Sequence, residues 1–351
     1  MRGPYSSGCG YSFSRRWLEL SFLALTFPGG SFAQTAQQAN AQAAAGLAAG
    51  KFDTAILQLE AAVRRFPQDA HLQFNLGLAL VRKGRLNDAV APLEKAAQDP
   101  SLATEARFLL GADYFESKQY EPAISALRGL ESSDHAERVL YMVEESNRRA
   151  GHIEEARAAF HQLITRYPDS AWTHYLLGTA YEDQQQLDKA VQEYKEALER
   201  DPKIPNAAFA IGYLYWRQQD SVNAREWLRK ETLHGCHSLA HFYLGEIART
   251  EREWRTAEAA YRQALVCDSA NGEAHLRLGI VLGNQKRFAE ALRQLKEAAR
   301  LQPNESSPHY HLASLYRQLG RNAEAESEYK KVHAIQASKD LGVDVTGESK
   351  R

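Results

Sequence analysis

Apolar side chains recur along this chain with the spacing of one helix face, in stretches separated by short turns. In residues 171–204, for example, Leu177 and Gly178 are followed by Tyr181, and several other stretches repeat this order of large, small and bulky residues. Offsets of three and four place residues on one face of an α-helix. A second amphipathic run, QLDKAVQEYKEALERDP at 186–202, follows after a short turn. The pattern predicts pairs of helices joined by turns.

One alanine stands at the same place in every second run, and this alanine sets the period of the chain. Successive alanines lie 33 or 34 residues apart from the first to the last. They are Ala55, Ala89, Ala123, Ala156, Ala190, Ala224, Ala257, Ala291 and Ala325. Self-similarity at a fixed period of this length indicates a repeat architecture, in which each helical hairpin packs on its neighbours.

A second small residue stands twelve positions before most of these alanines. It is Gly77, Gly111, Gly178, Gly212, Gly245 and Gly279, with Ala43 and Ala313 in the first and last repeats. Glycine inside a helix costs roughly 1 kcal/mol relative to alanine. Its recurrence there predicts a close crossing of two helices, where neither helix has room for a long side chain. Glycines at the turns, Gly50, Gly84, Gly151 and Gly320, separate the helices in four repeats.

The period, the small-residue crossing and the terminal proline of repeats such as 171–204 and 272–305 resemble the tetratricopeptide repeat (TPR) family. The resemblance covers about residues 36–339. It implies an all-α, right-handed superhelical solenoid of about nine helix-turn-helix repeats, with a concave groove lined by the first helix of each repeat. The expected repeats are 36–69, 70–103, 104–136, 137–170, 171–204, 205–237, 238–271, 272–305 and 306–339. Residues 340–351 are expected to be a disordered tail, since they are polar and lack the period.

Two repeats depart from the pattern. In 137–170, Glu144 stands where the small residue belongs and Asn147 where a bulky apolar residue belongs. The repeat 205–237 ends in KETLHGCHS instead of an apolar run and a proline. We therefore expect less regular structure near residues 137–150 and 230–240.

The N-terminal residues have the organisation of a secretory signal peptide. Arg15 and Arg16 precede an apolar stretch from Trp17 to Phe27, and Ser31-Phe32-Ala33 resembles a signal peptidase site. Residues 1–33 are accordingly predicted to be a signal peptide cleaved after Ala33, which leaves a periplasmic or secreted chain without a membrane span. Glu19 is unusual within such a stretch, and an uncleaved anchor is the alternative.

Composition narrows the classes of partner. The net charge is −1, with 44 % hydrophobic residues, so the chain lacks the basic excess expected of a nucleic-acid-binding protein. Three cysteines are present, of which Cys236 and Cys267 follow the predicted cleavage site. They lie near corresponding ends of successive repeats. Helix axes about 8–10 Å apart would separate them too far for a disulfide unless the irregular loop brings them together, and the sequence leaves this open.

An aromatic row on the first helices is the candidate partner-binding site. One equivalent place holds an aromatic residue in all but one of the repeats from 70 onward, where Leu276 stands instead. Aromatic side chains suit a peptide groove because they bury a large area at low entropic cost. The alternative is that they only pack within each hairpin. The row comprises Phe74, Phe108, Tyr141, Tyr175, Phe209, Phe242 and Tyr310, with Tyr213 and Trp216 widening it near Phe209.

Arginines share this face and are candidates for contacts with carboxylates, because guanidinium is a bidentate donor. A solvated helix face is an equally good interpretation. The candidates for the groove are Arg138, Arg149, Arg217 and Arg249.

No catalytic or cofactor signature is present. The sequence contains no GxSxG elbow, phosphate-binding glycine loop, HExxH or paired CxxC. His234, Cys236, His237 and His241 are the only grouping with metal-like chemistry, but His241 has counterparts in other repeats, which favours packing. We therefore expect neither an enzyme nor a metal or cofactor site. The sequence predicts a scaffold that binds a peptide segment or partner protein in its groove; the alternative is a structural subunit of an envelope or secretion complex, docking through its convex face or ends.

Overall fold

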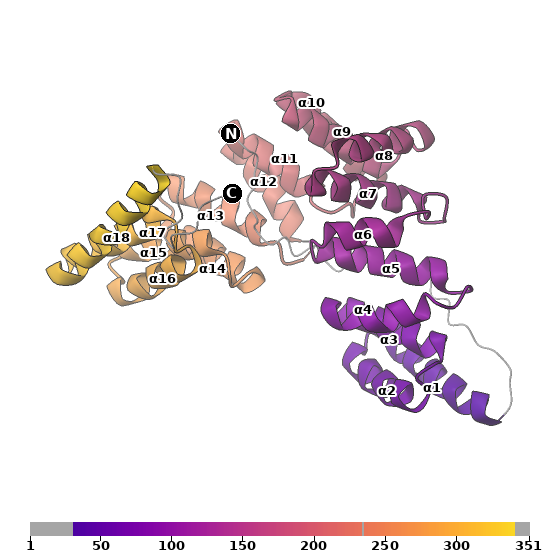
Figure 1. Ribbon diagram of the computed structural model, residues 1–351. Coiled ribbons are helices and arrows are strands. Elements are labelled where there is room, and N and C mark those ends of the chain that lie inside the picture. Colours follow the sequence, from indigo (N-terminus) through magenta and orange to yellow (C-terminus); the bar gives the residue numbers. More distant parts are fainter. Residues whose placement is uncertain (1–30, 234, 341–351) are drawn as a thin grey trace. The chain divides into compact units, whose positions relative to one another are not determined.

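The computed structural model describes residues 31–233 and 235–340, and in these residues every regular element is a helix (Figure 1). The predicted all-α class is confirmed. Residues 1–30, which hold nearly all of the expected signal peptide, and 341–351, which hold nearly all of the expected tail, lie outside the described residues.

The described chain falls into two units, residues 31–205 and residues 206–340. The first unit contains ten helices: α1 Ser31–Ala48, α2 Phe52–Arg65, α3 Ala70–Lys83, α4 Leu86–Ala96, α5 Ala103–Glu116, α6 Tyr120–Leu127, α7 Ala136–Ala150, α8 Ile153–Arg166, α9 Ala171–Asp183 and α10 Leu187–Arg200. The second contains eight: α11 Ala207–Arg217, α12 Ser221–Thr232, α13 Ser238–Thr250, α14 Trp254–Cys267, α15 Gly272–Asn284, α16 Phe288–Leu301, α17 Ser306–Gln318 and α18 Asn322–Asp340.

Within each unit the helices pair into hairpins, and neighbouring hairpins stack (Figure 1). Each odd-numbered helix packs most extensively on the even-numbered helix that follows it, and each even-numbered helix packs on the next hairpin of its unit. The nine alanines that set the period are all buried, at most 5 % exposed, in the second helices. The residue that defined the repeat in the sequence is therefore the residue on which the hairpins close.

The turn between the two helices of a hairpin has one left-handed residue in every repeat described. Glycine takes this place at Gly50, Gly84, Gly151 and Gly320, with φ between 69° and 88°. Five other repeats use a polar side chain, namely Lys118, Gln185, Gln219, Arg252 and Lys286, with φ between 59° and 63°. The turn is therefore conformationally the same throughout, although only its glycines identify it in the sequence.

The glycines of the first helices lie where those helices cross their partners. A Cβ atom at Gly178 would lie 2.8 Å from the Tyr194 ring, and one at Gly279 would lie 2.7 Å from Leu295 Cγ. Each contacted residue stands sixteen positions after its glycine. This geometry confirms the close-crossing interpretation, because a side chain there would occupy space already filled.

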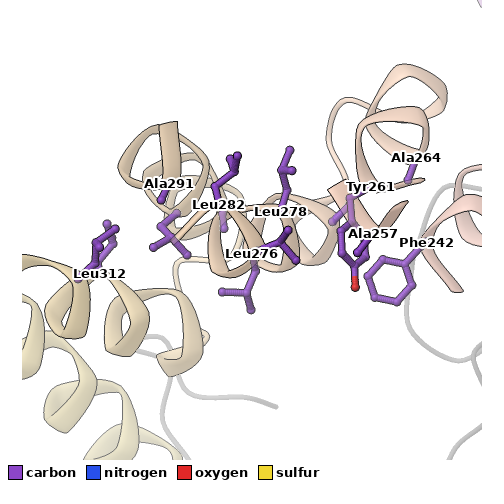
Figure 2. Packing of buried hydrophobic residues seen from close by; sticks show 14 of the residues in the cluster. Phe242, Ala257, Tyr261, Ala264, Leu276, Leu278, Leu282, Ala291 and Leu312 are labelled. Atoms are coloured by element: carbon purple, nitrogen blue, oxygen red, sulfur yellow. The ribbon is translucent and has the colours of Figure 1, made fainter. Parts of the chain in front are cut away.

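Buried leucine, alanine and aromatic side chains form the core between hairpins. In the second unit, Figure 2 shows Leu276, Leu278 and Leu282 of α15 between the residues of the preceding hairpin and those of α16 and α17. The Phe242 ring lies beside Tyr261, with ring centroids 5.8 Å apart.

The two expected irregularities have different outcomes. Helix α7 is continuous from Ala136 to Ala150, so its backbone is regular, and the departure expected near residues 137–150 is one of packing at Glu144. Asn147 is buried in it and donates a hydrogen bond to the Val143 carbonyl, 2.8 Å away. By contrast, α12 ends at Thr232 and α13 begins at Ser238, and the described residues between them, 233 and 235–237, form an irregular loop.

This loop carries one half of a disulfide. Cys236, in the loop, is bonded to Cys267, the last residue of α14, with a Cα–Cα distance of 5.3 Å. The bond joins the start of a hairpin to its end. It forms because Cys236 precedes α13 in an irregular segment and is not held at the axis-to-axis spacing of stacked helices.

Candidate functional site

In the first unit the aromatic row lies on α3, α5, α7 and α9. Phe74 is half-buried, whereas Phe108, Tyr141 and Tyr175 are buried. Phe108 stacks on His135 with ring centroids 4.0 Å apart. Tyr141 and Tyr175 both contact Trp172, at 4.5 and 6.3 Å between ring centroids. These three members of the row are therefore packed inside the array, against neighbouring repeats and, for Tyr175, also against Tyr194 of α10.

In the second unit the row divides in the same way. Phe209 is fully buried, and Tyr213 and Phe242 are nearly so. Trp216 is half-buried, and Tyr310 on α17 is 52 % exposed. In each unit the row therefore consists mainly of packed rings, and its members with accessible surface are Phe74, Trp216 and Tyr310.

Trp216 belongs to a cluster of four rings on α11 and α13, here called the aromatic cluster: Phe209, Tyr213, Trp216 and Tyr243. Ring centroids of Tyr213 and Trp216 are 5.8 Å apart, and those of Trp216 and Tyr243 are 4.7 Å apart. Trp216 and Tyr243 are half-buried, so the cluster has an accessible side. The Arg217 guanidinium lies 5.8 Å from the centre of the Tyr213 ring, within the range of a cation–π contact.

His237 packs against the Phe209 ring of the aromatic cluster. Its ring stacks on Phe209 at 4.8 Å between centroids, its Nδ1 accepts a hydrogen bond from the Ala240 amide, and its Nε2 lies 3.0 Å from Asn206 Oδ1. Because Nδ1 accepts, the proton of the neutral ring is on Nε2 and is donated to Asn206. Burial, with a smaller effect of His241, lowers the pKa of His237 to about 4. The imidazole is therefore a neutral helix cap with both ring nitrogens engaged within the chain.

The arginines of the predicted groove are engaged within the chain. Arg149 Nε donates to Glu145 Oε1 at 2.7 Å, and Arg249 makes two hydrogen bonds to Glu246, at 3.1 and 2.9 Å. Glu246 is buried, which alone would raise its pKa, but hydrogen bonds from Arg249 and Tyr261 hold that pKa below its usual value. Arg138 is half-buried on α7. A partner carboxylate would have to compete with these internal carboxylates for Arg149 and Arg249.

A model of the tetratricopeptide repeat family matches residues 40–103, 146–203, 175–232 and 276–339, which together make up more than half of the chain. The chain belongs to the tetratricopeptide repeat family. Its hairpins, crossing glycines and period are those expected of TPR proteins.

Among curated relatives, the chain is 23 % identical over 306 residues to Superkiller protein 3 of Schizosaccharomyces pombe, and the matched region covers 80 % of this chain and 21 % of that protein. It is 30 % identical over 129 residues to the type IV pilus assembly protein PilF of Pseudomonas aeruginosa, covering 36 % of this chain and 51 % of that protein. The chain thus spans about a fifth of the length of the first relative and half of the second.

Among solved structures, the chain resembles one from the APC/C hetero-tetramer Cut9-Hcn1, with a TM-score of 0.59, 17 % identity and coverage of 81 % of this chain and 58 % of the other. At this identity the likeness shows the fold, and the fold is that of a TPR array.

Sequence reasoning missed two rings of the TPR first helices. Trp172 packs against Tyr141 and Tyr175, and Tyr243 completes the aromatic cluster. Tyr243 directly follows Phe242. Helical spacing assigned Phe242 to the aromatic row and gave no reason to consider the residue next to it. A search for any aromatic residue on the accessible side of α11 and α13 would have found it.

Across residues 31–233 and 235–340, no group of three or more histidine, cysteine, aspartate or glutamate side chains is arranged to hold a metal ion. His234, part of the metal-like grouping in the sequence, lies outside the described residues, and Cys236 is consumed by the disulfide. No helix of these residues has the length and apolarity needed to cross a bilayer.

Proposed function

We propose that this TPR protein is an exported, non-enzymatic scaffold that binds a peptide segment of a partner protein on the first helices of residues 206–340. The aromatic cluster is the observation that carries the proposal. Trp216 and Tyr243 are half-buried and in contact, and rigid aromatic anchors of this kind supply much of the binding energy at protein interfaces. The packed Phe209 and His237 rings hold the anchors in place.

The disulfide supports the exported part of the proposal. Structural disulfides form and persist in oxidising compartments and are rare in the cytosol. Cys236 and Cys267 therefore agree with the signal-like residues 1–33, which lie almost wholly outside the described chain.

The test is a pull-down from an envelope extract with wild-type protein, Trp216→Ala and Trp227→Ala. Trp227 is a half-buried tryptophan on α12, the second helix of the same hairpin, so it is matched to Trp216 in residue type and in burial. We expect Trp216→Ala to lose the partner retained by Trp227→Ala. If both variants retain the partner, the aromatic cluster is not part of the binding site.

A structural subunit of an envelope assembly is the second candidate. The likeness to PilF, a type IV pilus assembly protein, favours it, although it covers about a third of this chain. Docking would then use the second helices or the ends of the array. Loss of the partner with Trp227→Ala but not with Trp216→Ala supports this candidate over the first.

A further inference from the structure

Helix α7 breaks the crossing rule of the array, and it does so with a charged residue. Six first helices place glycine at the crossing, in contact with a leucine or tyrosine sixteen positions later. In α7 the crossing residue is Glu144, and the residue sixteen positions later is Phe160 of α8. At the glycine crossings that later residue is at most 2 % exposed, whereas Phe160 is only half-buried. Glu144 therefore occupies the space into which Phe160 would otherwise pack.

A cavity of about 410 Å³ lies beside this displaced crossing, between α7, α8 and α9. Its apolar walls come from Ile153, Ala156 and Phe160 of α8 and from Leu176 of α9. Its polar lining consists of Glu144, Thr179 and Asp183 together with two arginines, Arg148 and Arg157. All of these residues belong to the first unit.

The Glu144 carboxyl is incompletely satisfied. Glu144 is 8 % exposed, and its Oε2 has no hydrogen-bond partner, while its Oε1 lies 3.9 Å from Arg148 Nε. A buried polar atom without a partner is costly, so its persistence calls for an explanation. The cavity that it lines provides room for a donor.

Charged groups of both signs surround the cavity. Arg148 and Arg149 both donate to Glu145, and Arg157 of α8 pairs with Glu154 at 3.1 Å. Arg148 also lies within ion-pair distance of Glu144, at 3.9 Å, so Asp183 is the one carboxyl among these residues without an ion pair. Burial, reinforced by Glu145, raises the pKa of Glu144 to about 8. The carboxyl is mostly protonated at neutral pH, and an entering cation would displace that proton.

We propose that this cavity binds the side chain of a lysine presented by a partner, with its ammonium on Glu144 Oε2 and its methylene stem against Phe160, Ile153 and Leu176. A compact ammonium suits a single unpartnered oxygen, whereas guanidinium favours two carboxylate oxygens in a fork. Asp183, at the exposed end of α9, adds attraction for the cation. The site lies outside the aromatic cluster, so it stands or falls independently of the proposed function.

The experiment titrates the full chain with N-acetyl-lysine methylamide and with N-acetyl-norleucine methylamide, which has a similar stem but no ammonium. The methyl groups of Ile153 and Thr179 line the cavity and serve as NMR reporters. We expect the lysine compound to shift both signals with saturation and the norleucine compound to leave them unchanged. Equal shifts with both compounds, or none with either, overturn the proposal.

Variants assign the binding to Glu144. Glu144→Gln keeps the shape and removes the charge, and it is expected to weaken lysine binding about tenfold, the scale of one charge-assisted hydrogen bond. Glu155→Gln, on the exposed face of α8, is the matched control and should bind as wild type does. Unchanged affinity in Glu144→Gln overturns the proposal.

Two further measurements keep the test decisive if Glu144→Gln is unstable. Asp183→Asn changes an exposed residue and is expected to weaken binding by a smaller factor. The wild-type affinity should also rise between pH 6 and pH 8.5, because Glu144 ionises there while the lysine ammonium stays charged. The other charged groups facing Glu144 are Glu145, Arg148 and Arg149 of α7, Arg157 of α8 and Asp183 of α9. An affinity that is independent of both Asp183 and pH contradicts the proposal.

Discussion

The role of a single glycine in this array depends on whether neighbouring side chains fill the space that a Cβ atom would occupy. Gly279 and Gly283 lie four residues apart on α15, yet a Cβ atom at Gly279 would press into Leu295 Cγ at 2.7 Å, whereas one at Gly283 would meet nothing within 4 Å. The two positions share a helix and a residue type and differ in their neighbours. Comparing them distinguishes the role of glycine in packing from its unfavourable effect on helix stability.

Substitution of each glycine by alanine should therefore have opposite effects. Gly279→Ala is expected to lower the free energy of unfolding by about 1–3 kcal/mol, the cost of overpacking a filled crossing. Gly283→Ala is expected to raise it by up to about 1 kcal/mol, because alanine favours the helix. Urea denaturation of both variants measures the difference. Equal changes in the two would contradict the crossing interpretation.

His237 carries a second effect that belongs to one residue. It is buried as a neutral cap, and its folded pKa of about 4 lies below the ordinary value of 6.5. The unfolded chain therefore binds a proton more readily than the folded one between these values. The stability that this group contributes is complete above pH 6.5 and is lost as the pH falls toward 4.

His237→Asn tests this linkage, because asparagine also caps a helix but does not titrate. Between pH 7 and pH 4.5 the wild type should lose on the order of 2 kcal/mol more stability than the variant. The variant has a constant deficit from the lost stacking on Phe209. His161→Asn, at an exposed position of α8, controls for the change of residue type. Parallel pH profiles for wild type and His237→Asn would show that His237 does not titrate in this window.

The candidate site shows how far residue patterns reach. Helical spacing placed Trp216, Phe209 and Phe242 on first helices, and the structure has them there. It did not tell which rings are buried, since the face that lines a groove and the face that meets the next first helix are adjacent on the same helix. Glu144 was recognisable as a departure, but the cavity depends on where Phe160 packs, and that is a property of three helices together.

At the scale of helices and turns, the period predicted nearly all of the helices and where the turns between them fall. Nine alanines fixed the register, and the helices of residues 31–340 follow it closely. Five of the left-handed turn residues could not be recognised in the sequence, because lysine, glutamine and arginine can take that conformation without being typical of it. The disulfide was left open for a related reason: the spacing of stacked helices is predictable, whereas the path of an irregular loop is not.

The disulfide stabilises the α13–α14 hairpin because it closes a loop between two cysteines that are 31 positions apart in the sequence. Loop-closure arguments give about 3–4 kcal/mol for a loop of this size. Cys267→Ser should therefore lower the melting temperature, and a reductant should lower it by a similar amount in wild type and not in the variant. Thermal melts with and without reductant measure both. A wild-type melt that is insensitive to a reductant shown by mass spectrometry to have opened the bond would contradict the estimate.

At the scale of the whole chain, export and the disulfide form one prediction. If residues 1–33 direct secretion, the chain expressed in a Gram-negative host should be recovered from the periplasm with its N-terminus at Gln34 and with Cys236 bonded to Cys267. An oxidising compartment supplies the conditions for the bond. Intact-mass analysis before and after thiol alkylation reads the N-terminus and the bond in one measurement.

The control places a charge in the apolar stretch of the leader. Leu23→Arg should block export, since the stretch must be apolar to act as a signal, and the chain should then stay in the cytosol with Met1 or Arg2 at its N-terminus and with free thiols. Its melting temperature should match that of Cys267→Ser, because both lack the same bond. Wild-type protein that keeps residues 1–33 while forming the disulfide would favour the uncleaved anchor. Cytosolic wild-type protein with free thiols would remove export altogether, and with it the oxidising conditions on which the stability of the α13–α14 hairpin is predicted to depend.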